Sequence, residues 1–122
     1  MLTLFVAAAL GFSSPPAAHL ALGNASAPLA ISSWCWRGHC GAPLAASTRV
    51  AVVPRGYLVQ CDLGFTPTQA TLTVGGRKAT VAINGNVNAV TWHAQWAGGI
   101  TLRVQSSSGW VVYVGRIALR HA

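Results

Sequence analysis

Apolar and polar residues alternate with a period of two from residue 48 to the end of the chain, and turn residues interrupt this alternation repeatedly. Successive side chains of a β-strand point to opposite faces of a sheet, so the alternation is typical of strands with one buried and one exposed face. No segment of this region carries the ~3.6-residue repeat of an amphipathic helix. The pattern therefore predicts an antiparallel all-β domain over residues 48–122.

The alternation also predicts which side chains face the core. Val50 and Val52 share one face of the first expected strand, and Asn84-Gly85 predicts a tight turn. The last strand is apolar on both faces as far as Val114, and we interpret Gly115 as a bulge or a crossing point. The other residues expected to face inward are Tyr57, Val59, Cys61, Leu63, Leu72, Val74, Val90, Trp92, Ala94, Trp96, Ile100, Leu102 and Val104.

The number and spacing of these strands predict the architecture. About seven short strands in about 75 residues favour a two-sheet antiparallel β-sandwich of immunoglobulin-like type. A small barrel is the alternative. The cystine of immunoglobulin domains is missing, because Cys61 in the second expected strand has no cysteine opposite it in the sixth.

The first residues of the chain predict export. The apolar run MLTLFVAAALGF has the length of a signal-peptide hydrophobic region, and Ser-Ser-Pro-Pro and a stretch of small residues follow it. We therefore expect a signal peptide over residues 1–25, cleaved after Gly23 or Ala25, a cystine-loop segment over 26–47 and the sandwich over 48–122. The run is shorter than the ~20 residues of a membrane-spanning helix, so no transmembrane span is expected. The predicted location is secreted, periplasmic or extracellular.

The charge of the chain is strongly one-sided. Eight Lys and Arg residues stand against one acid, Asp62, for a net charge of +7, and all of them follow residue 30. Such a surface attracts polyanions, although positive charge can also serve solubility alone. The cations form no single run, which favours anionic envelope polymers or acidic glycans as partners over sequence-specific reading of nucleic acid.

The segment Trp34-Cys35-Trp36-Arg37-Gly38-His39-Cys40 is the most distinctive motif of the chain. With Cys61 it offers four soft zinc ligands, but adjacent His39 and Cys40 suit tetrahedral coordination poorly. A thioredoxin-like redox pair would need two intervening residues and a βαβ context. In an exported protein, two nearby cysteines most often close a disulfide. We predict a Cys35–Cys40 disulfide, a protected thiol at Cys61 and no metal site.

The order of these features resembles that of small secreted bacterial β-sandwich domains of unknown function, whose N-terminal segment reads Cys-Trp-x-x-x-Cys. The similarity covers residues 33–120 and is most specific in Ser-Trp-Cys-Trp-Arg-Gly-His-Cys. Those domains tend to carry an acid just after the second cysteine, where this chain has Gly41 and Ala42. The resemblance implies a fold and an exported location, and it implies no activity.

The composition offers few of the acidic side chains that catalysis commonly uses. Because Asp62 is the only carboxylate, paired-carboxylate chemistry is excluded. A Ser-His-Asp arrangement would need Asp62 to meet His93 or His39 beside an activated serine. We therefore expect a non-catalytic protein without a cofactor.

Five tryptophans exceed what a core of this size usually needs. Trp34, Trp36 and Trp110 have no clear inward parity, and exposed indoles stack on sugar rings, with Arg37 able to add a charged hydrogen bond. These four residues are the predicted ligand-binding site. In the alternative, Trp34 and Trp36 cover the disulfide at an open end of the sandwich. The predicted function is a structural or interaction module at the cell envelope, with glycan or anionic-polymer binding as the alternative.

Overall fold

A computed structural model describes residues 14–23, 25–41, 43 and 49–120, and no helix occurs among them. The apolar run at the start of the predicted signal peptide, and Ala42, lie outside these residues. The strands are β1 (His19–Leu22), β2 (Ala25–Pro28), β3 (Ala30–Trp36), β4 (His39–Gly41), β5 (Ala51–Pro54), β6 (Leu58–Asp62), β7 (Gln69–Val74), β8 (Arg77–Ala79), β9 (Ala82–Asn84), β10 (Ala89–His93), β11 (Gly98–Ser106) and β12 (Gly109–Arg120).

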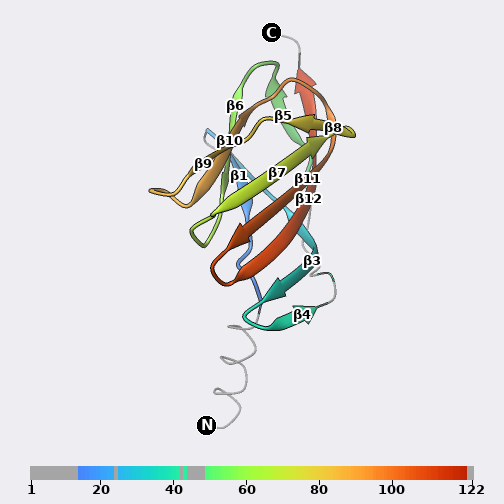
Figure 1. Cartoon of the computed structure of the whole chain (residues 1–122). Helices are drawn as coiled ribbons and strands as arrows, with labels where there is room; N and C mark the ends of the chain where they lie inside the picture. Colours follow the sequence, from blue (N-terminus) through green and yellow to red (C-terminus); the bar gives the residue numbers. More distant parts are fainter. Residues whose placement is uncertain (1–13, 24, 42, 44–48, 121–122) are drawn as a thin grey trace.

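The strands form two sheets, as Figure 1 shows. One sheet has the order β2-β1-β6-β10-β9, and the other has the order β4-β3-β12-β11-β7-β8, with β5 beside the end of β12. All pairs are antiparallel except β5 with β12. The all-β, two-sheet antiparallel prediction is therefore confirmed.

The sheets extend further toward the N-terminus than the boundary expected at residue 48. β1 to β4 belong to the two sheets, and β1 pairs with β6 through Leu20 and Cys61. Leu20 is only 1% exposed. β1 thus lies inside the segment predicted as a signal peptide, and the structure has more strands than the seven expected.

The predicted core alternation is confirmed along most strands. Side chains of both sheets meet in one apolar cluster that includes Val59, Cys61, Leu72, Leu102 and Val104. The first expected strand differs, because Val52 is 50% exposed while its neighbours in β5 are buried. The face that Val52 shares with Val50 is thus the solvent face.

β12 changes its partner partway along its length. It pairs with β3 as far as Val114 and with β5 from Ile117 onward. Gly115 therefore marks a crossing point, and a Cβ atom there would overlap Leu29. The bulge itself lies earlier, between Val112 and Tyr113. The expected tight turn at Asn84-Gly85 is the start of a longer turn, residues 85–88.

Because most consecutive strands reverse direction, the turns between them gather at two ends of the sandwich. We call one the cystine end: it holds the turns at 37–38 and 107–108 and the loop 63–68. We call the other the arginine end: it holds the turns at 55–56 and 75–76, the connection 94–97 and the end of β12 at Arg120. In Figure 1 the β3–β4 hairpin lies at the bottom, and the end of β12 lies at the top with β5 and β8 nearby.

Candidate functional site

The motif that stands out in the sequence forms a β-hairpin closed by a disulfide. Cys35 of β3 and Cys40 of β4 are paired in register and bonded to each other, with their Cα atoms 4.0 Å apart. Arg37 and Gly38 form the turn with positive φ angles of 52° and 82°. The disulfide prediction is confirmed. Because the two sulfurs are bonded to each other, neither is a thiolate that could bind zinc in the alternative considered above.

The two indoles of this hairpin point into the molecule. Trp34 is 8% exposed and Trp36 is 4% exposed, and Trp36 packs edge-on against Phe65 with the ring centres 4.9 Å apart. The expectation that their faces are open for stacking on a ligand is therefore wrong for this structure. Their burial agrees with the alternative, in which they cover the end of the sandwich.

The other two residues of the predicted site lie elsewhere. Trp110 is paired with Cys35 and so lies on the face of the sheet opposite to the buried indoles. Its ring is covered by the guanidinium of Arg103, 4.5 Å from the ring centre. Arg37 is exposed at the turn, and its backbone N–H donates to the carbonyl of Ser108 over 2.7 Å. The four predicted residues therefore do not surround one open surface.

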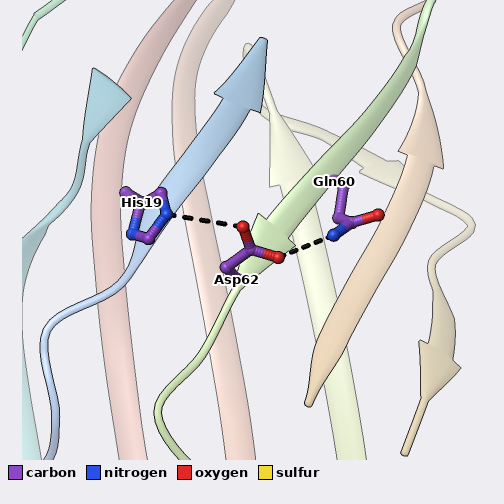
Figure 2. A network of polar contacts seen from close by, with 3 residues as sticks. All are labelled: His19, Gln60 and Asp62. Atoms are coloured by element: carbon purple, nitrogen blue, oxygen red, sulfur yellow. Dashed lines mark hydrogen bonds and ion pairs between the residues drawn. The ribbon is translucent and has the colours of Figure 1, made fainter. Parts of the chain in front are cut away.

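Asp62 takes part in a small polar network between β1 and β6 (Figure 2). Gln60 Nε2 donates to Asp62 Oδ1 over 2.7 Å, and His19 Nε2 lies 3.4 Å from Asp62 Oδ2. His93, at the far end of β10, has its Nδ1 3.1 Å from the carbonyl of Gly56 instead. Asp62 thus meets neither His93 nor His39. Its two contacts are not nucleophiles, so the network joins strands and builds no catalytic triad.

Two titratable side chains are enclosed by the core. Burial, with a smaller effect from the charge of Asp62, raises the pKa of the Cys61 thiol to about 12. Burial also raises the pKa of the Tyr113 hydroxyl, which donates to the carbonyl of Pro16 over 2.7 Å. Both groups are therefore held in their neutral forms. Among the described residues, no group of three or more His, Cys, Asp or Glu side chains is placed to hold a metal ion.

An open pocket of about 640 Å³ lies at the arginine end. Three of its lining residues are arginines from separate segments: Arg55 from the β5–β6 turn, Arg77 from the start of β8 and Arg120 from the end of β12. Trp96, in the connection between β10 and β11, is partly buried in the same wall. The remaining lining residues are Gly75, Gln95, Ala97 and Leu119.

Internal contacts hold two of these guanidinium groups. Arg55 Nη1 donates to the carbonyl of Gln95 over 2.9 Å. The guanidinium of Arg77 lies 5.5 Å from the ring centre of Trp96, within the range of a cation–π contact. Neither contact neutralises the charge of its arginine, so donors on both groups remain for a ligand.

The pocket has no carboxylate among its lining residues. Asp62, the chain's one acidic side chain, is at the C-terminal end of β6, whereas the pocket is near the start of that strand. Asp62 is four residue steps along the strand from Leu58, or about 13 Å at ~3.3 Å per residue. A planar guanidinium donates two parallel hydrogen bonds to a carboxylate, sulfate or phosphate. The arrangement is therefore suited to binding anions.

Sequence reasoning missed this site because it read each cation in its own segment. Arg55 and Trp96 belong to connections between strands, Arg77 begins β8, and Arg120 ends the last strand. The direction of the predicted strands could have revealed that these residues lie at one end of the sandwich. In an antiparallel order every second turn lies at the same end of the sheet, so counting strands would have placed these segments together.

Comparisons with protein-family models, with curated proteins and with solved structures found no match to this chain. The resemblance to small secreted β-sandwich domains therefore stays a prediction. In the part of the chain that the structure describes, no helix is long and apolar enough to cross a membrane.

Proposed function

We propose that this protein is an exported, non-catalytic β-sandwich module that binds anionic groups of cell-envelope polymers or glycans at its arginine end. One observation carries the proposal: three arginines from separate parts of the chain line one open pocket, beside a tryptophan and without a lining carboxylate. The binding residues of this proposal are Arg55, Arg77, Arg120 and Trp96.

Electrostatics supports this assignment. Like charges brought to one place repel each other and raise the free energy of the folded state, so the cluster does not stabilise the fold by itself. An anion placed among the three guanidinium groups would remove that repulsion and accept charge-assisted hydrogen bonds. The Cys35–Cys40 disulfide supports export, because disulfides persist mainly in oxidising compartments.

The test compares two double variants with the same change in charge. Arg77→Gln with Arg120→Gln alters the pocket, whereas Arg37→Gln with Arg103→Gln alters the surface around the disulfide, where the sequence alone placed the ligand. We expect the pocket variant to bind immobilised polygalacturonate and linear polyphosphate about tenfold more weakly at low salt. The control variant should bind within about twofold of the wild type, a difference of ~0.4 kcal/mol.

The salt series completes the test. Binding of the wild type should weaken steeply toward physiological ionic strength, where exposed charges are screened over ~8 Å. Equal losses in the two double variants would mean that diffuse charge, and not the pocket, holds the polymer. A larger loss in the control would move the site to the cystine end, and absence of wild-type binding at low salt would overturn the proposal.

A further inference from the structure

A second pocket, of about 390 Å³, adjoins the arginine pocket. Gln95 and Trp96 line both pockets, so one ligand of sufficient length can contact the two pockets on either side of these residues. The second pocket differs in character. Its other lining residues include the apolar Leu58, Ala79, Ala82 and Trp92, and the polar residues Lys78, Thr80, Thr91 and His93.

The strand pairing explains why this space is open. β9 ends its pairing with β10 at Ala82, opposite Thr91, so Trp92 and His93 have no strand neighbour on that side. β8 ends at Ala79, and Thr80 and Val81 carry the chain from one sheet to the other. The pocket is therefore a gap in the sandwich where two short edge strands leave β10 uncovered.

Trp92 is the second observation that points to a ligand. It is 2% exposed, and its Nε1 is the one buried side-chain nitrogen or oxygen without a hydrogen-bond partner among the described residues. Leaving such a donor unpaired costs about 1–3 kcal/mol. Trp92 is one of the residues that line the second pocket, but its Nε1 is itself buried. A ligand oxygen there recovers that cost only if neighbouring side chains move enough for it to accept this hydrogen.

His93 indicates that the ligand also carries donors. The contact between His93 Nδ1 and the carbonyl of Gly56 requires the proton to be on Nδ1, because a carbonyl only accepts. Nε2 of the neutral ring is then an acceptor, and the hydroxyls of Thr80 and Thr91 both donate and accept. A phosphate or sulfate chain without hydroxyls offers no hydrogens to these groups. A sugar does, and the apolar face of its ring stacks on an accessible indole, which in this pocket is the partly exposed Trp96.

We propose that the ligand is an acidic saccharide chain, with its anionic group among Arg55, Arg77 and Arg120 and the neighbouring sugar in the pocket of Trp92 and Trp96. This inference rests on the proposed function, since it assigns the chemical class of the anion bound there. It requires at least two linked sugar units, because the charged pocket and the mixed pocket are separate spaces that share only Gln95 and Trp96.

The experiment compares a short oligomer of galacturonic acid with a linear polyphosphate of equal charge. Ala82→Phe places a ring at the mouth of the second pocket from an exposed position of β9. Ile83→Phe is the matched control, because Ile83 is also exposed on β9 and does not line the pocket. We expect Ala82→Phe to weaken binding of the oligogalacturonate about tenfold and to change polyphosphate binding less than about twofold. Ile83→Phe should leave both unchanged.

Tryptophan fluorescence gives an independent readout. Because Trp96 lines both pockets, we expect both ligands to change the emission of the wild type. Ala82→Phe should reduce the change caused by the oligogalacturonate and leave the change caused by the polyphosphate as it is. If Ala82→Phe weakens neither ligand, or weakens both equally, the saccharide assignment is overturned. The proposed function still stands in that case, provided that the Arg77→Gln, Arg120→Gln variant weakens both ligands. If this arginine variant weakens neither, both proposals fail together.

Discussion

The two ends of the sandwich use tryptophan and arginine in opposite ways. At the cystine end Trp34 and Trp36 are buried, and the only arginine of the hairpin, Arg37, points to solvent at the turn. At the arginine end Trp96 is partly exposed in the wall of a pocket lined by three arginines. The first end is closed by packing and a covalent bond, and the second is open and charged.

This difference shows that residue type alone does not identify a binding surface. The hairpin is rich in tryptophan because an open end of two sheets must be covered by large apolar side chains. Trp34 and Trp36 of this hairpin were predicted to bind a ligand, whereas the structure places both side chains in the hydrophobic core. The tryptophan at the other end is next to cations that have no acidic partner among the lining residues, so its surroundings indicate binding.

The largest expected contrast is between two tryptophan truncations. Trp36→Ala removes a nearly buried indole and its contact with Phe65, so we expect the free energy of unfolding to fall by about 3–5 kcal/mol. Trp96→Ala should cost about 1 kcal/mol, because its ring is only partly buried. Urea denaturation measures both. Equal losses would contradict the division into a packed end and a binding end.

The same pair of variants separates stability from binding. Folded Trp36→Ala should bind polygalacturonate like the wild type, whereas Trp96→Ala should bind it several-fold more weakly. The reverse pattern would place the ligand at the cystine end.

Reduction of the Cys35–Cys40 disulfide should have a smaller effect, limited to one end. The loop that it closes is short, with a sequence separation of five residues. The chain-entropy relation gives such a loop about 2 kcal/mol, so the domain should stay folded. Hydrogen exchange should quicken in β3 and β4 only. The Cys35→Ser, Cys40→Ser variant serves as control, since reductant should not change it. Faster exchange around Arg55 or Arg77 would show that the two ends are coupled.

The smallest expected effect is a loss of stability in mild alkali. Burial raises the pKa of the Cys61 thiol from 9.0 to about 12, so the unfolded chain loses this proton at lower pH than the folded one. The stabilisation is complete below pH ~9 and is lost as pH rises toward 12, with about 1 kcal/mol gone at pH 10. Urea titrations at pH 8 and pH 10 measure it. Cys61→Ala should remove most of this slope.

Anion binding at pH 8 and pH 10 tests whether the arginine pocket depends on the stability of the core around Cys61. The residues that line the arginine pocket include no cysteine, tyrosine or lysine, the side chains whose ordinary pKa lies near the range from pH 8 to pH 10. Binding of polygalacturonate per folded molecule should therefore not change over this range. A parallel fall in binding and stability would mean that the pocket depends on the core around Cys61.

Most of the fold could be predicted, because it follows from local patterns. The inward positions of β6, β7, β10 and β11 follow from alternation over a few residues, and Cys61 was correctly placed in the core. The first strand was harder to assign. Val50-Ala51-Val52-Val53 is apolar throughout, so alternation does not say which face is buried, and the structure buries Ala51 and Val53.

The membership of β1 and β2 in a sheet could not be read from alternation. Their residues are mostly small, and the segment follows an apolar run typical of a signal peptide. β1 is a strand because it pairs with β2 on one side and with β6 on the other, where Leu20 is in register with Cys61. The parity of Trp34 and Trp36 was likewise undecided until β3 was seen to pair with β12.

Strand character, the Cys35–Cys40 disulfide and the excess of positive charge all follow from the amino-acid sequence without knowledge of the fold. Each of these depends on composition or on residues only a few positions apart. The tertiary structure decided which turns share an end, and so brought Arg55, Arg77 and Arg120 to one pocket. These segments are far apart in the sequence, since Arg55 donates to a carbonyl 40 residues away, and only the pairing of whole strands brings such segments together.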